Sequence, residues 1–204
     1  MPTLYLLLAH GISDFLLQPQ KLVKWKHDTY KGLILHSFIH FVVGLMIFLP
    51  YMPNFKVVGA LFGVSVAHIG IDMMKIYFEE HKDRTKNYLF LFLVDQFAHL
   101  VVILFVGFLL TGEFVHYRLA DGFLGFIMQI YNHAALPIGL ILIIMATYAY
   151  EIFIYQCQRD VHEKAKFNPN RSQMLKRLII TSIIFTLFLI FGIYTIAAHT
   201  PGVL

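Results

Sequence analysis

The sequence is poor in charged residues and in cysteine. Asp, Glu, Lys and Arg make up 14% of its 204 residues, against roughly 25% in soluble globular domains. The single cysteine, Cys157, excludes a disulfide framework and any cysteine-based zinc or iron–sulfur site. The apolar share of 58% and the mean hydropathy of +0.69 exclude a disordered chain. Together these values indicate a small polytopic membrane protein.

Five apolar stretches reach or approach the length of about 20 residues that a helix needs to cross a bilayer. They cover residues 32–52, 57–78, 88–111, 134–157 and 178–198. A shorter stretch at 3–17 carries His10 and Asp14 in its middle and lacks the basic start of a signal peptide, so we expect it to stay as a first helix. The sequence therefore predicts an all-α, polytopic transmembrane helical bundle with about six membrane helices.

Thirteen of the 16 basic residues fall in alternate connections, after the first, third and fifth predicted helices. The positive-inside rule places these connections in the cytoplasm and both termini on the other side of the membrane, as expected of a multi-pass membrane protein. The net charge of +4 then indicates attraction to anionic membrane lipid and no nucleic-acid partner. In the outer connection, 112–133, we expect an interfacial helix over 119–131, with an extension of the fifth membrane helix as the alternative.

Ionisable residues inside the first four predicted spans occur in pairs spaced i, i+4, which places both side chains on one helical face. Because the helices alternate in direction, all four pairs are predicted to lie on the cytoplasmic side of the bilayer midplane. Ionisable groups inside a membrane are costly and are functional candidates. The pairs are His10 with Asp14, His36 with His40, His68 with Asp72, and Asp95 with His99.

The first four predicted helices look like a duplicated helical hairpin. The pattern Ala-His-x-x-x-Asp at 9–14 recurs at 67–72, and the pair at 36 and 40 is echoed at 95 and 99. A pseudo-two-fold axis along the membrane normal would bring the four pairs into one cavity. We therefore divide the chain into a motif-bearing core at 1–111 (hairpins 1–52 and 57–111), the connection 112–133, and two C-terminal membrane helices at 134–204.

Imidazole and carboxylate ligands together favour a transition metal, with Zn first and Fe or Mn next, as one or two ions. Two ions bridged by a carboxylate would suit hydrolysis of a phosphoester or another lipid-linked anionic substrate. Asp14, Asp72, Asp95 and Lys75 are the predicted catalytic residues, Gln18 and Gln96 the supporting donors of the cofactor site, and Lys21 and Lys24 further bases for an anionic headgroup. The predicted metal ligands are His10, Asp14, His36, His40, His68, Asp72, Asp95 and His99.

Other interpretations use the same residues. The pairs can satisfy each other's hydrogen bonds in a purely structural bundle, with Lys75 paired to Asp72. They can also line the pathway of a metal-ion or proton transporter, or two facing histidines can bind haem. A transporter needs polar residues in the outer halves of the helices, where the sequence is almost entirely apolar. A one-sided hydrolase site is therefore the leading hypothesis.

Four motifs stand in order in the first half of the chain: A-H-x-x-x-D-F-x-x-Q from Ala9, H-x-x-x-H from His36, A-H-x-x-x-D-x-x-K from Ala67 and D-Q-x-x-H from Asp95. In these motifs the chain resembles the bacterial membrane family called domain of unknown function 3307 (DUF3307). The resemblance implies a small polytopic inner-membrane protein without an assigned activity. The last two predicted helices carry none of the motifs and are expected to serve as scaffold or as a homo-oligomer surface.

Overall fold

The protein is all-helical in this computed structural model, which describes residues 1–52, 54–81, 87–113, 130–162 and 165–199. Its described elements are α1 (Pro2–Gly11), η1 (Ile12–Leu16), α2 (Gln20–Asp28), α3 (Tyr30–Ile47), η2 (Leu49–Tyr51), α4 (Phe55–His81), α5 (Tyr88–Leu109), η3 (Thr111–Glu113), α7 (Ala135–Ile144), η4 (Met145–Ala149), α8 (Tyr150–Val161) and α9 (Arg171–His199). The predicted all-α helical bundle is confirmed.

Five described helical stretches are long and apolar enough to cross a membrane: α3, α4, α5, the continuous α7–η4–α8 rod, and α9 up to Ile190. Large apolar side chains such as Phe38, Phe62 and Phe105 point outward with more than half of their surface exposed, whereas His36 and Asp72 are buried. This inverted distribution suits a hydrocarbon solvent and is that of a multi-pass membrane protein. The predicted helix at 3–17 forms as α1 and η1, outside these five.

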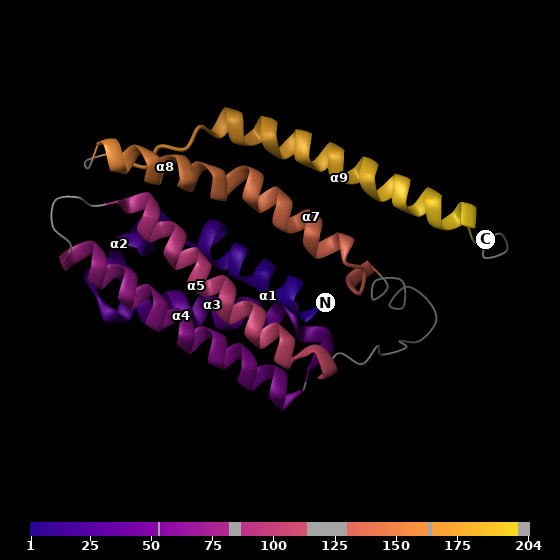
Figure 1. The fold of residues 1–204 in the computed structure, drawn as a ribbon, viewed down its shortest axis with the longest axis horizontal. Coiled ribbons are helices and arrows are strands. Elements are labelled where there is room, and N and C mark those ends of the chain that lie inside the picture. Colours follow the sequence, from indigo (N-terminus) through magenta and orange to yellow (C-terminus); the bar gives the residue numbers. More distant parts are fainter. Residues whose placement is uncertain (53, 82–86, 114–129, 163–164, 200–204) are drawn as a thin grey trace.

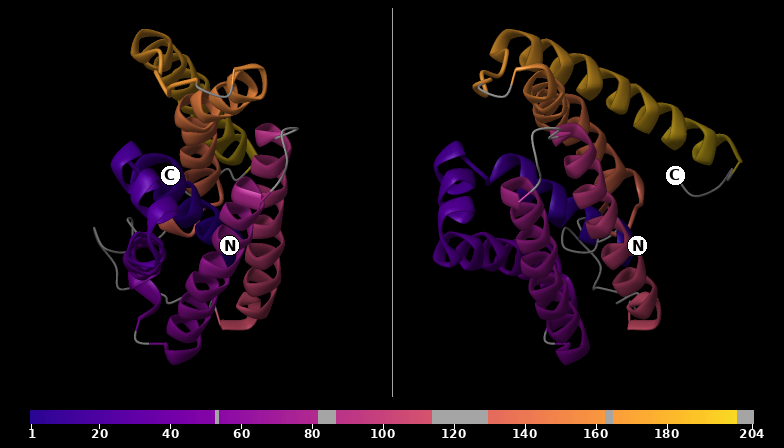
Figure 2. Two further views of the ribbon diagram at one scale, coloured as in Figure 1. Left: turned by 90° about the vertical axis from the view of Figure 1, so that its left-hand side faces the viewer. Right: turned by 60° about the vertical axis from the view of Figure 1, so that its left-hand side comes forward.

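The helices pack side by side along one long axis (Figure 1). Helix α3 packs on α4, α4 on α5, and α5 on both α1 and α8. Helix α7 covers α1, and α9 lies on the outer side of α7 and η4. Figure 2 shows α9 standing apart from the α1–α5 group, with α7 and α8 between them. The motif-bearing helices thus form one bundle that the C-terminal helices cover on one side.

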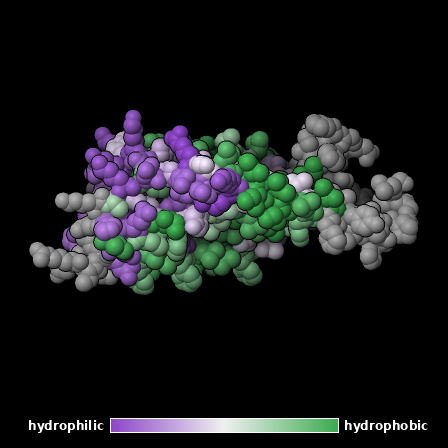
Figure 3. All heavy atoms as spheres, turned by 90° about the horizontal axis from the view of Figure 1, so that it is seen from above, coloured by the Kyte–Doolittle hydropathy of each residue, from purple (hydrophilic) through white to green (hydrophobic). Residues whose placement is uncertain are grey.

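The two ends of the molecule differ in polarity. Helix α1 begins and α9 ends at one end, whereas α2 and the connection from α8 to α9 lie at the other (Figure 1). Hydrophilic residues gather at that second end on the face seen in Figure 3. The side of the membrane on which this end lies stays a prediction from the basic residues. The predicted interfacial helix at 119–131 lies almost wholly outside the described residues.

Local side-chain caps explain where several helices start. The Thr29 hydroxyl accepts from the Gly32 amide at 3.2 Å at the start of α3, and the Asn87 side chain accepts from Phe90 at 2.8 Å at the start of α5. Asn170 accepts from the Gln173 amide at 3.1 Å ahead of α9. Each such cap satisfies a backbone N–H that has no partner within its helix.

Helix α2 lies directly on α3, at a point where α3 has no side chain. A Cβ atom added at Gly32 would overlap the backbone of Trp25 and Lys26. Of the α2 side chains, Leu22 is buried. The close contact at Gly32 fixes α2 across the end of the bundle and points Lys26 inward, where its ammonium group meets Asp72.

The interior of the bundle has an apolar half and a polar half. The apolar half is a cluster of buried side chains that includes Tyr5, Phe48, Val57, Leu61 and Ile103. It lies toward the end at which α1 begins. The buried histidines and aspartates lie in the other half.

Candidate metal centre

All eight predicted ligand residues come together in the polar half of the bundle. Helix α1 and the π-helical turn η1 carry one pair, and α3, α4 and α5 carry one pair each. Seven of the eight are buried, and His10 keeps 12% of its side chain exposed. Their ligand atoms form three neighbouring groups, each within 4.8 Å: His10, Asp14, His40 and His68; His36, His68 and Asp72; Asp72, Asp95 and His99.

Asp14 lies at the centre of the first group. Its Oδ1 atom is 2.8 Å from His40 Nε2, 3.1 Å from His36 Nε2 and 3.6 Å from His68 Nε2. Its Oδ2 atom is 3.5 Å from His10 Nε2. Asp14 is held in η1, a π-helical turn of the kind that often occurs at functional sites. One carboxylate therefore faces four imidazoles from three different helices.

His68 and Asp72 connect the three groups. His68 Nε2 lies 3.4 Å from Asp72 Oδ2 and 3.1 Å from His36 Nε2. Two imidazole nitrogens at that distance either share one proton or present their lone pairs to a common partner. Asp72 also belongs to the third group, with Asp95 and His99. Neighbouring groups that share a residue could hold two adjacent ions.

The ring of His99 is held in place by its own helix. Its Nδ1–H donates to the backbone oxygen of Asp95 at 2.8 Å. A neutral imidazole that donates from Nδ1 keeps a lone pair on Nε2, which is the usual state of a metal-bound histidine. The Nε2 atom is buried and has no hydrogen-bond partner, and the same is true of His10 Nε2, His36 Nδ1 and Asp95 Oδ1. Such orphaned atoms cost about 1–3 kcal/mol each, so a further partner at these positions would stabilise the cluster.

Lys75 contacts the cluster, but its partner is not the Asp72 carboxylate that a purely structural bundle was expected to give it. Its Nζ donates to Asp95 Oδ2 at 2.9 Å, and the predicted pairing with Asp72 is wrong. The reason is packing between helices, because α5 lies against the face of α4 that carries Lys75.

The cation that pairs with Asp72 is Lys26, with Nζ donating to Oδ2 at 3.0 Å. In the sequence Lys26 looks like one of several basic residues in the connection after the first predicted helix. Lys21 and Lys24, the bases expected to hold a headgroup, are exposed on the outer side of α2. The spacing of Leu22 and Lys26 could have identified Lys26 as the inward-facing lysine. Once α2 is recognised as a helix, these two residues lie one turn apart on the same face.

The two glutamines predicted as supporting donors both lie beside the cluster. The Gln18 amide is 3.3 Å from His36 Nε2, and with its oxygen turned inward it accepts from Lys26 Nζ at 2.6 Å. Gln96 Nε2 donates to Asp95 Oδ2 at 3.1 Å. These contacts hold a ring and two charged groups in place, which is what polar neighbours of metal ligands do.

The family comparison covers the part of the chain that carries the cluster. The family model described as "Protein of unknown function (DUF3307)" matches residues 3–120. The chain belongs to the DUF3307 family. The DUF3307 match covers α1 to α5 and so includes all eight clustered residues, whereas α7, α8 and α9 lie beyond it. No curated protein and no solved structure matches the chain.

Proposed function

We propose that this protein is a membrane-embedded, metal-dependent hydrolase that cleaves a phosphoester in a lipid-linked substrate. The observation that carries the proposal is the set of three adjoining groups of buried histidine and aspartate atoms, each within 4.8 Å. The mixture of imidazole nitrogen and carboxylate oxygen favours a transition metal, with Zn first and Fe or Mn next. The three groups share His68 and Asp72 and could therefore hold two ions with ligands in common.

The charge balance of the cluster also calls for a cation. The cluster contains three carboxylates, Asp14, Asp72 and Asp95, and two ammonium groups, with Lys26 paired to Asp72 and Lys75 to Asp95. With neutral imidazoles this leaves one unit of negative charge among side chains that are almost completely buried. An unbalanced charge at this depth is costly. One divalent ion together with one negative charge of a bound phosphate would bring the sum to zero, and the ion would partner the orphaned ring nitrogens.

The roles of the residues follow from their positions. A bound divalent ion supplies an acidic water near neutral pH and stabilises a leaving oxygen. Asp14, held against four imidazoles, is placed to orient the ion-binding rings, and Asp72 is placed to join the neighbouring groups. Lys26 and Lys75 supply positive charge at the edge of the cluster, where phosphate oxygens can replace their carboxylate partners.

The transport alternative is less well supported. A pathway through the membrane needs polar groups on both sides of the cluster. Instead, the interior toward the start of α1 is filled by Leu8, Phe48, Leu61 and Ile103, all buried and apolar. Haem fits no better, because the His40 and His68 ring centres are only 3.8 Å apart. The one-sided cluster favours chemistry over conduction.

Metal content tests the first half of the proposal. The protein is purified without chelator, and bound Zn, Fe and Mn are measured by mass spectrometry. We expect about one to two equivalents in the wild type. His68→Ala, which removes a residue shared by two groups, should lower the content more than His99→Ala, which affects one group. The exposed His81 lies outside the three groups, so His81→Ala is the matched control and should leave the content unchanged.

Phosphate release tests the second half. Metal-loaded protein is mixed with phosphatidic acid vesicles, and inorganic phosphate is measured over time with wild type, Asp14→Asn and His81→Ala. We expect release by the wild type and the His81 variant and only background release by Asp14→Asn. Metal content below about half an equivalent, or phosphate release that survives Asp14→Asn, would overturn the proposal.

A further inference from the structure

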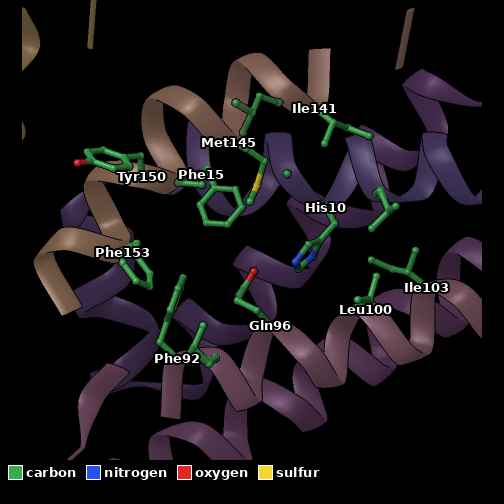
Figure 4. Close-up of a pocket in the computed structure, with 15 residues that line it drawn as sticks. His10, Phe15, Phe92, Gln96, Leu100, Ile103, Ile141, Met145, Tyr150 and Phe153 are labelled. Atoms are coloured by element: carbon green, nitrogen blue, oxygen red, sulfur yellow. The ribbon is translucent and has the colours of Figure 1, made fainter. Parts of the chain in front are cut away.

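A second feature adjoins the metal centre and shares His10 with it. It is an apolar pocket of about 440 Å³ between α1, α5 and the α7–η4–α8 rod. Figure 4 shows the imidazole of His10 and the amide of Gln96 pointing into a space otherwise surrounded mainly by hydrocarbon side chains. The volume lies within the range of small-molecule binding sites, which is about 300–1,000 Å³.

His10 belongs to both the pocket and the metal centre. It lines the pocket, and its Nε2 atom is 3.5 Å from Asp14 Oδ2 in the first ligand group. A molecule in the pocket can therefore place a polar group beside the metal ligands while its apolar part remains among Leu7, Ile103 and Ile141. The junction of one polar edge with a long apolar space matches a molecule with one polar end.

The shape and the surroundings indicate a hydrocarbon chain. Along α5 the lining runs from Phe92 to Ile103, a distance of about 16 Å at the helical rise. Leu93, Leu100 and Met145 in the wall are also partly exposed on the outer surface of membrane-spanning helices. The pocket thus has access from the lipid side, and in a bilayer an apolar space of this kind is filled by lipid chains because water gains nothing there.

Two irregular helical turns shape this pocket. The π-helical segments η1 and η4 contact each other, and they bring Phe15, Met145 and Ala149 to its wall. A π-turn shifts the register of a helix by one residue, and such turns often occur at functional sites. The same turn η1 that carries Asp14 into the metal centre therefore also borders the apolar pocket.

We propose that the pocket holds the hydrocarbon chain of a long-chain lipid phosphate, with the phosphate at His10 beside the metal centre. The placement of the phosphate rests on the proposed hydrolase function, whereas the binding of the chain does not. The lipid phosphate is then the substrate class of the site, and α1, α5 and the α7–η4–α8 rod select for the length of its chain.

Photolabelling with phosphatidic acid that carries a diazirine at the end of one chain tests this assignment. Protein in detergent micelles is titrated with the probe, irradiated and digested, and the labelled peptides are identified. Leu100→Trp fills the pocket from α5, and Met145→Trp fills it from η4. The matched controls are Leu104→Trp and Leu142→Trp, which are similarly exposed on the same two helical stretches and do not line the pocket.

We expect saturable labelling of pocket residues in the wild type and both controls. A Trp side chain in the pocket takes up space that the hydrocarbon chain would occupy, so both filling variants should lose labelling by about tenfold or more. Competition by unlabelled phosphatidic acid or by a polyprenyl phosphate distinguishes an acyl from an isoprenoid chain, and either result supports the proposal. Labelling that neither lipid displaces, or that the filling variants retain, overturns it.

The metal content of the same samples separates this inference from the proposed function. Saturable pocket labelling in a protein that binds no metal would support the chain site and refute the metal centre. Bound metal together with labelling spread evenly over the outer faces of α3, α4 and α5 would do the reverse. Neither Leu100 nor Met145 is a ligand residue, so both filling variants should keep wild-type metal content.

Discussion

Replacing Lys26 by methionine removes the ammonium group that faces Asp72 and keeps most of the apolar stem. The two charged atoms are 3.0 Å apart, so their attraction at an effective dielectric constant of about 20 is about 5.5 kcal/mol before desolvation is subtracted. Only 12% and 3% of the two side chains are exposed, and breaking a buried pair costs about 3–5 kcal/mol. Because His68 and His36 also face Asp72, we expect the lower end, about 3 kcal/mol, for metal-free protein.

A bound divalent ion changes this expectation, because it provides the positive charge that Lys26 otherwise provides. With saturating Zn²⁺ we expect the penalty of Lys26→Met to fall to about 1 kcal/mol, and by reciprocity the variant should bind Zn²⁺ about 30-fold more tightly than the wild type. Thermal unfolding in detergent, with Zn²⁺ or with chelator, measures the difference. For a chain of this length 3 kcal/mol corresponds to a loss of about 6–12 °C in Tm.

Lys24→Met is the control, because Lys24 is exposed on the same helix and its loss should leave Tm nearly unchanged in both conditions. Zn²⁺ affinity is measured separately by titration with a competing chelator. An equal loss of Tm for Lys26→Met with and without Zn²⁺ would show that Lys26 does not substitute for a cation, and the reasoning would be refuted.

Two further predictions concern packing and pH. A Cβ atom at Gly107 would overlap Thr3 in α1, whereas one at Gly63 meets no atom within 4 Å, so Gly107→Leu should destabilise the protein by about 1–3 kcal/mol in thermal unfolding and Gly63→Leu by much less. Burial raises the pKa of Tyr131 above its ordinary value of 10.0. The protonated phenol therefore stabilises the fold below pH 10, and this contribution to the free energy of unfolding is lost as the pH rises above that value. The decline of Tm above pH 10 should therefore be less steep in Tyr131→Phe and unchanged in the control Tyr30→Phe, since Tyr30 is 73% exposed.

The membrane helices and the clustered residues could be predicted because both follow from helical geometry and from the bilayer. Apolar runs of about 20 residues set the helices, and the i, i+4 spacing puts each pair on one face. The cost of exposing His or Asp to lipid then leaves the interior as the place where such faces meet. His36 and Asp72, which are almost completely buried, fulfil that expectation. Their roles as ligands stay predictions.

The parts that could not be predicted depend on packing between elements. Helix α2 has nine residues and is rich in charge, so it resembles a connection in any hydropathy profile. Lys26 could not be told from its neighbours until the contact between α2 and α3 was known, and the pairing of Lys75 with Asp95 depends on how α4 meets α5. The π-turns η1 and η4 leave no recognisable pattern in the sequence, and the pocket between them is equally hidden.

The absence of a side chain at Gly32 has a consequence for the contact between α2 and the buried cluster. Even a methyl group there would lift α2 away from α3. Lys26 would then be drawn away from Asp72. The hydrogen atom that Gly32 has in place of a side chain thus keeps α2 close enough to α3 for Lys26 to reach the Asp72 carboxylate inside the bundle.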